Sequence, residues 1–234
     1  MTPQNLAIVG YGKMGRLIES LAPEYGFAVK LRLDIDNNAN FEGFTEQNFR
    51  GIAAAVEFST PSTAPENIER LARLGVNTVV GTTGWFDQLE RARAAVESHG
   101  TGLVWSPNFS VGVHIFSQIV AEAARLLARQ PDYGAWAWEI HHATKKDAPS
   151  GTLLALIEKM KQSGYARPID ASSSRAGTVA GTHEIGFDSA ADTITLRHTA
   201  RSRDGFARGA LRAARWVAGK KGFFDFRDIV NELP

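Results

Sequence analysis

The sequence has 234 residues, a length typical of one large domain or two small ones. It contains no cysteine, which excludes disulfides, cysteine-bound zinc, iron–sulfur clusters and a thiol nucleophile, and fits a reducing compartment. Lysine and arginine total 26 against 25 acidic residues, so the formal charge of +1 excludes a strongly basic nucleic-acid coat. No apolar run approaches the roughly 20 residues of a membrane span. We expect a cytoplasmic protein that binds neither nucleic acid nor membranes.

The first 105 residues alternate short apolar runs with segments of helical spacing. The apolar runs predict buried strands at 6–9, 28–33, 53–58, 78–80 and 103–105. Helices are predicted at 14–21, 65–75 and 86–99. Strands that alternate with helices pair in parallel, so this half predicts an α/β domain with a Rossmann-type doubly wound parallel sheet. The stretch 35–51 is poor in apolar residues and predicts an abbreviated second crossover.

The pattern changes after Asn108. The remaining chain predicts helices at 111–130, 151–162 and 206–218, and strands at 135–140, 182–187 and 193–199. This order indicates an α+β second domain with a mixed sheet, and we assign residues 110–206 to substrate binding and oligomerisation. We assign residues 1–109 and 207–234 to dinucleotide binding, because the last helix can return to pack on the first domain.

A glycine-rich turn follows the first predicted strand. Gly10, Gly12 and Gly15 match G-x-G-x-x-G, in which the glycines permit a tight turn, a close approach of the backbone to a pyrophosphate, and close packing of helix on strand. Asp34 lies 19 residues after Gly15, at the end of the second strand, where a carboxylate can accept hydrogen bonds from the adenosine ribose. The predicted dinucleotide-binding residues here are Val9, Gly10, Tyr11, Gly12, Lys13, Met14, Gly15 and Asp34.

Two further loops follow strands of the same sheet, at the edge where open α/β sheets bind ligands. They add Gly81, Thr82, Thr83, Ser106, Pro107, Asn108 and Phe109 to the predicted dinucleotide site. The Asp34 carboxylate favours NADH, because it repels a 2′-phosphate. Arg32 and Lys13 are close in sequence, so NADPH stays open as the second cofactor.

A second cluster of polar residues lies at 139–152, directly before a capped helix. His141, His142 and Lys145 can exchange or donate protons, and the helix start at Ser150 offers backbone N–H groups to an anion. The cluster indicates a small anionic substrate that is protonated after hydride attack. No metal is expected, because adjacent histidines point in opposite directions on a strand and no partner follows at i+4. A solvated charged loop is the alternative.

The segment from Glu139 to Thr152 resembles the active-site signature E-x-H-H-x-x-K-x-D-A-P-S-G-T of the 4-hydroxy-tetrahydrodipicolinate reductase family, formerly called dihydrodipicolinate reductases. The resemblance extends to the glycine turn, to Gly81-Thr82-Thr83, to 108–112 and to Arg175-x-Gly177-x-x-x-Gly181-x-His183. It implies NAD(P)H-dependent reduction of 4-hydroxy-tetrahydrodipicolinate to tetrahydrodipicolinate, on the route to diaminopimelate and lysine. It also implies a homotetramer built on the sheet of the second domain.

The resemblance also implies roles for single residues. His141 is expected as general acid/base and Lys145 as proton donor, with His142, Gly151 and Thr152 binding the substrate. Unlike longer members of the family, this chain has no Glu-Arg pair after the second strand. Two alternatives to this enzyme are another small two-domain amino-acid dehydrogenase and a non-catalytic dinucleotide-sensing module.

A stripe of arginines marks the last predicted helix. Arg208, Arg212 and Arg215 fall on one side of that helix. They indicate either a nucleic-acid contact or a solvated helix face, and the near-neutral total charge favours the solvated face.

Overall fold

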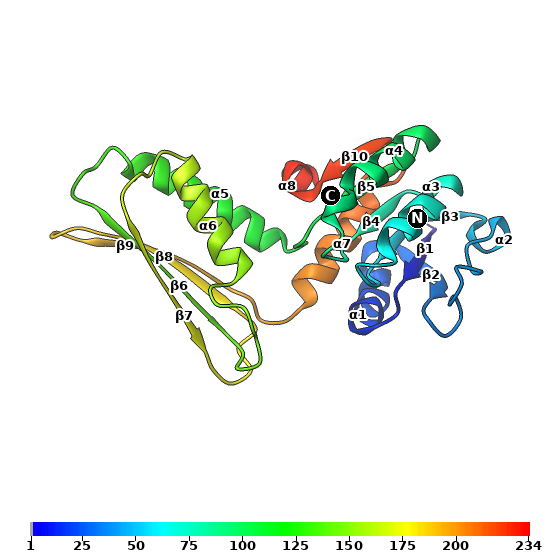
Figure 1. The fold of residues 1–234 in the computed structure, drawn as a ribbon, viewed down its shortest axis with the longest axis horizontal. Helices are drawn as coiled ribbons and strands as arrows, with labels where there is room; N and C mark the ends of the chain where they lie inside the picture. The colour runs from blue at the N-terminus through cyan, green and yellow to red at the C-terminus, as the bar shows by residue number, and fades with distance from the viewer. Residues whose placement is uncertain (1) are drawn as a thin grey trace. The chain divides into compact units, whose positions relative to one another are not determined.

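A computed structural model describes residues 2–234 and divides them into two compact units. The first unit comprises the residues up to Ser110 together with Asp204–Pro234, and the second comprises Val111–Arg203. Each unit contains one sheet (Figure 1). The chain therefore leaves the first unit once and returns to it for its last 31 residues.

The first unit is built on a six-stranded sheet in which all neighbouring strands are parallel. Its strands, in spatial order, are β10 (Gly222–Asp225), β5 (Gly102–Trp105), β4 (Thr78–Val80), β3 (Ile52–Glu57), β1 (Gln4–Val9) and β2 (Phe27–Leu33). The chain runs outward from β1 to β2 and then resumes on the other side of β1 with β3. This reversal creates a switch point between β1 and β3, where ligands bind in open α/β sheets.

Helices cover both faces of this sheet, as a doubly wound fold requires. The main helices are α1 (Lys13–Leu21), α3 (Ala64–Arg73), α4 (Leu89–His99) and α7 (Asp204–Val217). Leu71 of α3 packs with Val9 of β1. The neighbouring Ile8 points to the opposite face, where α1 approaches it at Gly15. The expected Rossmann-type sheet is confirmed.

Short elements connect the strands and helices of the first unit. They are η1 (Ala22–Tyr25), α2 (Glu46–Phe49), η2 (Phe86–Gln88), α8 (Phe226–Ile229) and η3 (Val230–Glu232). Only the single turn of α2, capped by Thr45, lies between β2 and β3, which confirms the abbreviated crossover. The edge strand β10 was not expected from the sequence, because four residues that begin with a glycine give too little alternation to identify a strand.

The arginine stripe of α7 binds other parts of the same unit. Arg208 pairs with Glu24 at 2.6 Å, and Arg215 donates to the backbone carbonyl of Tyr25 at 3.2 Å. Arg212 donates to the carbonyls of Leu233 and Pro234. The stripe thus fastens α7 to η1 and to the C-terminal residues. The sequence favoured a solvated helix face for these arginines. In the structure they bind other segments of the same unit instead of serving only as solvated charges.

The second unit has a mixed four-stranded sheet with two helices on one face (Figure 1). The strands, in spatial order, are β7 (Ile169–Arg175), β6 (Gly134–His141), β8 (Thr182–Asp188) and β9 (Thr193–Thr199). The helices are α5 (Val111–Leu127) and α6 (Gly151–Gln162). Phe116, Leu156 and Phe187 are among the buried residues that join helices to sheet. The expected mixed sheet is confirmed, although β7 was missed.

The other face of this sheet carries large aromatic residues without a covering element of its own unit. Alternation along β6 places Trp136, Trp138 and Ile140 on this face, opposite to buried Ala137. Trp136 lies against Gly186, where a Cβ atom would be only 2.0 Å from the indole. The Trp138 indole donates to Ser174 at 3.2 Å. The three side chains on β6 remain half-buried.

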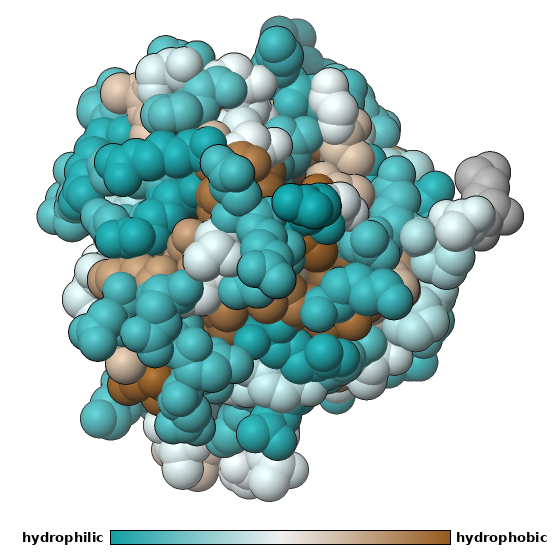
Figure 2. Space-filling view, turned by 90° about the vertical axis from the view of Figure 1, so that its right-hand side faces the viewer, coloured by the Kyte–Doolittle hydropathy of each residue, from teal (hydrophilic) through white to brown (hydrophobic). Residues whose placement is uncertain are grey.

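The surface of the molecule is polar where Figure 2 views it, on the right-hand side of Figure 1. Hydrophilic side chains predominate there, and apolar ones show only in gaps between them. Within residues 2–234, none of the helices combines the length and the apolar character needed to cross a membrane.

Candidate active site

The glycine turn after β1 has the geometry that its sequence predicted. Gly10 has a φ of +89°, and a Cβ atom there would lie 2.3 Å from the Phe58 carbonyl oxygen. A Cβ atom at Gly15 would lie 2.4 Å from the Gly10 carbonyl oxygen, so α1 can pack here only without a side chain. Gly12 caps α1 and has no atom within 4 Å of its Cβ position. The backbone at Gly12 is therefore open to a ligand, such as a pyrophosphate at the helix start.

A cleft of about 440 Å³ lies at the carboxyl ends of β1, β3 and β4. Six of the residues predicted for dinucleotide binding line it: Gly12, Lys13, Met14, Gly81, Thr82 and Thr83. The loop after β3 adds Phe58, Ser59 and Pro61, which were not predicted as site residues. The cleft lies at the switch point of the sheet, and its size and open glycine turn suit part of a dinucleotide.

Buried side chains hold the loops that form this cleft. Trp85 is only 1% exposed and donates its indole N–H to the Thr82 carbonyl at 2.8 Å. In the loop after β5, the Ser106 hydroxyl donates to the Asn108 carbonyl at 2.7 Å. The Phe109 ring packs edge-on against Phe226 and is 2% exposed. Any contact of Phe109 with a dinucleotide would therefore use its backbone.

The end of β2 carries the residues that bear on cofactor choice. Asp34 is half-buried, and its Oδ1 accepts a hydrogen bond from the Ile35 N–H at 3.0 Å. Arg32 binds the Glu19 carboxylate, which also accepts a hydrogen bond from the Tyr11 hydroxyl. These contacts from Arg32 and Tyr11 lower the pKa of Glu19, so it is ionised at neutral pH. Arg32 is therefore already paired in this structure.

In the second unit, the carboxylate of Glu139 is the centre of the polar cluster. Glu139 is fully buried on β6. Its Oε1 accepts from the Ser150 backbone N–H at 2.8 Å, from the Ser173 hydroxyl at 2.9 Å and from the Arg175 guanidinium at 2.8 Å. The Ser150 hydroxyl also donates to Oε2. Burial opposes ionisation, but these hydrogen bonds outweigh it and hold the pKa of Glu139 at about 2.

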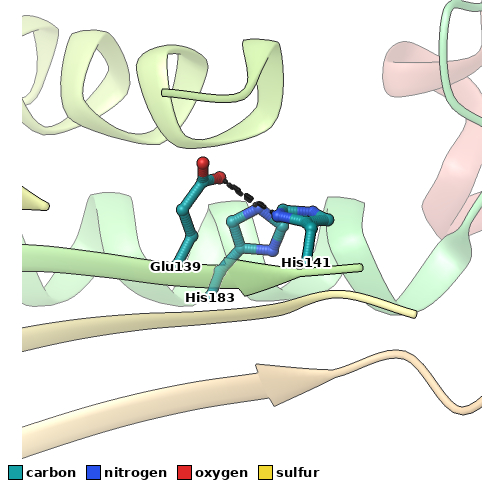
Figure 3. Close-up of side chains that lie close together, drawn as sticks. All are labelled: Glu139, His141 and His183. Carbon is teal, nitrogen blue, oxygen red and sulfur yellow. Dashed lines mark ion pairs between the residues drawn. The ribbon is translucent and has the colours of Figure 1, made fainter. Parts of the chain in front are cut away.

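Two histidines lie against the same carboxylate (Figure 3). Oε2 of Glu139 is 3.6 Å from Nδ1 of His141 and 3.4 Å from Nε2 of His183, and the two rings meet edge-on with centroids 5.1 Å apart. Burial lowers the pKa of both histidines, to about 4 for His183. His141 is therefore neutral at neutral pH, and its ring can accept a proton from a bound reactant or return one.

Lys145 lies in the loop that joins β6 to α6. Its ammonium group pairs with the Asp147 carboxylate at 2.7 and 3.0 Å, which lowers the pKa of Asp147. Arg175 donates to the backbone carbonyl of Asp147 and so connects this loop to β7. His142 hydrogen-bonds the Thr144 hydroxyl at 2.8 Å and is half-buried. The loop thus holds Lys145 against Asp147.

The start of α6 is open in front of this cluster. Ser150 caps the helix by accepting the Leu153 N–H at 3.1 Å. Gly151 has no atom within 4 Å of its Cβ position and is exposed, and Thr152 is half-buried. The helix dipole favours an anion at this end, where the Gly151 backbone N–H bonds the Asp147 carboxylate and the Leu153 N–H bonds the Ser150 hydroxyl. A substrate carboxylate can therefore approach Gly151 and Thr152.

The structure brings together three possible metal ligands that the sequence did not connect. Atoms of Glu139, His141 and His183 lie within 4.8 Å of one another. The sequence prediction against zinc rested on the adjacent histidines, whereas the fold places His183 of β8 beside His141. In the structure, Arg175 already neutralises Glu139, and two serines donate to the same carboxylate. A cation here would have to compete with these protein donors.

Comparison with known proteins decides the family. A family model described as the N-terminus of dihydrodipicolinate reductase matches residues 4–109, and one described as its C-terminus matches residues 112–230. The chain belongs to the dihydrodipicolinate reductase family. Its reaction is the reduction of 4-hydroxy-tetrahydrodipicolinate, a step of lysine and diaminopimelate biosynthesis, and enzymes of this family use a nicotinamide dinucleotide. The match over both halves supports the reductase over the two alternative functions left open by the sequence.

Individual relatives span nearly the whole chain. The 4-hydroxy-tetrahydrodipicolinate reductase of Christiangramia forsetii is 34% identical over 242 residues, which cover 98% of each chain. That of Thiobacillus denitrificans is 34% identical and covers 97% of this chain and 98% of its own. A dipicolinate-bound dihydrodipicolinate reductase from Paenisporosarcina sp. TG-14 shares the fold, with a TM-score of 0.79 at 21% identity, and covers 99% of this chain and 100% of its own.

Sequence reasoning gave no role to several residues that build the reductase site. Glu139, Arg175 and His183 were quoted only as part of the family pattern, yet they form one buried network. Trp85 was not singled out, although it holds the Thr82 carbonyl. For Glu139 and His183 the available signal was an ionisable residue within a largely apolar strand, where such residues are seldom buried without a partner.

We expect the buried network to make the protein sensitive to acid. The pKa values of His141 and His183 lie below their ordinary value of 6.5, and that of Glu139 lies below 4.5. A group whose pKa is lower in the folded protein than in the unfolded chain stabilises the fold at pH values above its unfolded-state pKa. It loses this contribution as the pH falls. The free energy of unfolding should fall from about pH 6.5 downward, with Glu139 accounting for about 2–3 kcal/mol between pH 4.5 and 2.

Denaturant unfolding at a series of pH values measures this effect. Glu139→Gln should be less stable at pH 7 and should lack the part of the decline below pH 4.5 that Glu139 causes. Glu90→Gln is the matched control, because the Glu90 side chain is 89% exposed. Parallel declines for wild type and Glu139→Gln below pH 4.5 would contradict the assignment.

Proposed function

We propose that the second unit binds the cyclic dicarboxylate at the start of α6 and protonates it with His141 and Lys145. The observation that carries this proposal is the juxtaposition of the open helix start with a buried, neutral histidine and a paired lysine. Gly151 and Thr152 hold one substrate carboxylate through their backbone N–H groups, and His142 contacts the substrate. Glu139 fixes the helix cap at Ser150, and its Oε2 lies 3.6 Å from Nδ1 of His141.

The first unit holds the dinucleotide along the glycine turn and in the cleft beside it. The open backbone at Gly12 receives the pyrophosphate, and the loops at 81–83 and 106–109 contact the remainder. When bound there, a reduced nicotinamide would supply a hydride to C4 of the substrate, whose hydroxyl would leave as water with the proton from Lys145. Lys145 donates a proton during this exchange, and His141 acts as general acid/base.

We infer that NADH binds at least as tightly as NADPH. The Asp34 carboxylate at the end of β2 accepts ribose hydroxyls and repels a 2′-phosphate. Arg32, the nearest cation on the same strand, already forms an ion pair with Glu19. Lys13 is exposed in the turn and is the other candidate to bind a phosphate.

We also infer a homotetramer built on the sheet of the second unit. The face with Trp136, Trp138 and Ile140 lacks a covering element within its unit, and the Arg197–Glu184 ion pair lies beside Trp138 on the same face. Aromatic residues are enriched in protein interfaces, and a second copy of the same sheet is the partner that we infer. A cytoplasmic location is consistent with the absence of cysteine.

The proton donors are tested by single substitutions assayed with freshly made 4-hydroxy-tetrahydrodipicolinate and NADH. His141→Ala and Lys145→Ala should each lower kcat by about 10²–10⁴-fold, the contribution typical of general acid–base groups. The Kd for NADH should stay unchanged, because the dinucleotide binds the other unit. Lys146→Ala is the matched control, since Lys146 is exposed and adjacent, and it should turn over normally. Near-normal kcat in both test variants would reject the roles assigned to His141 and Lys145.

The cofactor inference is tested by calorimetric titration of both dinucleotides. Wild type should bind NADH at least as tightly as NADPH. Glu19→Gln should release Arg32 and shift the affinity ratio toward NADPH by about 3–10-fold, the effect of one partly exposed charge contact. A large preference of wild type for NADPH would overturn the inference. An unchanged ratio in Glu19→Gln would show that Arg32 does not determine the choice.

A further inference from the structure

Glu57 is a second fully buried carboxyl group, and no step of the proposed reaction uses it. It is the last residue of β3 and has no exposed surface. Its strand partners are Val9 of β1 and Val80 of β4. The carboxyl group therefore lies at the switch point of the sheet, directly beneath the loops that line the dinucleotide cleft.

The side chain of Glu57 contacts three separate segments of the first unit. Oε1 accepts from the Ser59 backbone N–H at 3.1 Å, from the Ser59 hydroxyl, and from the Asn67 amide at 3.2 Å. The Thr82 hydroxyl also interacts with the carboxyl group. Asn67 belongs to α3, while Ser59 and Thr82 line the cleft. One side chain thus connects two walls of the cleft to the helix between them.

The surroundings of Glu57 differ in charge from those of Glu139. The groups that face Glu57 come from the loop after β3, from α3 and from the loop after β4, and Ser59, Asn67 and Thr82 are all uncharged. Glu139, by contrast, has the Arg175 guanidinium at 2.8 Å. An ionised carboxylate buried without a cation is costly, so such a group takes up a proton instead. Burial accordingly raises the pKa of Glu57, whereas that of Glu139 lies at about 2.

We propose that Glu57 is a neutral carboxylic acid that positions the walls of the dinucleotide cleft. Its Oε1 accepts from Ser59 and Asn67. Its protonated Oε2 donates to the Thr82 hydroxyl oxygen, and both of these buried oxygens otherwise lack a hydrogen bond of normal geometry. Glu57 acts through Ser59 and Thr82 and is a positioning residue, not a catalytic one. The proposal rests on the dinucleotide site proposed above.

Three variants separate this role from a merely structural one. Glu57→Gln keeps the shape and supplies both an acceptor and a donor, so the Kd for NADH should stay within about threefold of wild type at pH 7. Glu57→Met leaves the Ser59 and Asn67 donors unpaired and should raise that Kd by about tenfold or more. Thr82→Val removes one partner and should weaken NADH binding even if Glu57→Met does not fold. The Kd for pyridine-2,6-dicarboxylate, which reports on the second unit, should not change in any of them.

Difference infrared spectroscopy tests the charge state directly. At pH 7, wild type should show the C=O stretch of a protonated carboxylic acid that Glu57→Gln lacks. The absence of this band would overturn the proposal, as would a Glu57→Gln variant that binds NADH as weakly as Glu57→Met. If wild type bound neither NADH nor NADPH, the proposed dinucleotide site itself would fail, and this result is distinct from either of those outcomes.

Discussion

The buried pairing of Glu139 with Arg175 is the constraint on which the reductase site depends. A carboxylate without solvent is stable only when charge and hydrogen bonds compensate its lost hydration. Here Arg175 supplies the charge, while Ser150 and Ser173 supply hydrogen bonds. These partners come from β7 and from the start of α6, so the carboxylate fixes the strand and helix that border the cluster. The same carboxylate lies beside the rings of His141 and His183.

This arrangement explains how one short segment can serve both the binding and the proton transfer that we propose. The Ser150 hydroxyl donates to Glu139 and also caps α6. One residue therefore connects the start of the helix to the carboxylate beside the histidine rings. Lys145 is held by Asp147, whose backbone carbonyl is bound by Arg175. Displacement of any one member would move the others. The dense spacing of the signature from Glu139 to Thr152 follows from these shared contacts.

The two units use buried carboxyl groups in opposite ways. Glu139 has a cationic partner and is ionised, and it organises the proposed substrate side. Glu57 has only neutral partners, and burial favours its protonated form beneath the dinucleotide cleft. Identical chemical groups thus acquire different charges because of their neighbours alone, and each charge state suits the contacts that the group makes.

Most of the fold was predictable from the sequence, because apolar strands and helical periodicity carry a direct signal. The parallel sheet, the glycine turn and the capped α6 follow from local patterns. Strand β7 was not predicted, since it reads Ile-Asp-Ala-Ser-Ser-Ser-Arg: Ile169 packs on the apolar core, and polar contacts of Ser173 and Arg175 secure the other end. The pairing of Glu139 with Arg175, 36 residues apart, is a tertiary contact that no local pattern reveals.

A double-mutant cycle on the free energy of unfolding tests the central role of this ion pair most directly. Arg175→Met alone should cost about 3–5 kcal/mol, because it leaves a buried carboxylate uncompensated. In the Glu139→Gln background the same change should cost at least about 2 kcal/mol less, since no charge then remains to compensate. Costs that agree to within about 0.5 kcal/mol in the two backgrounds would show that the residues act independently and would contradict the account.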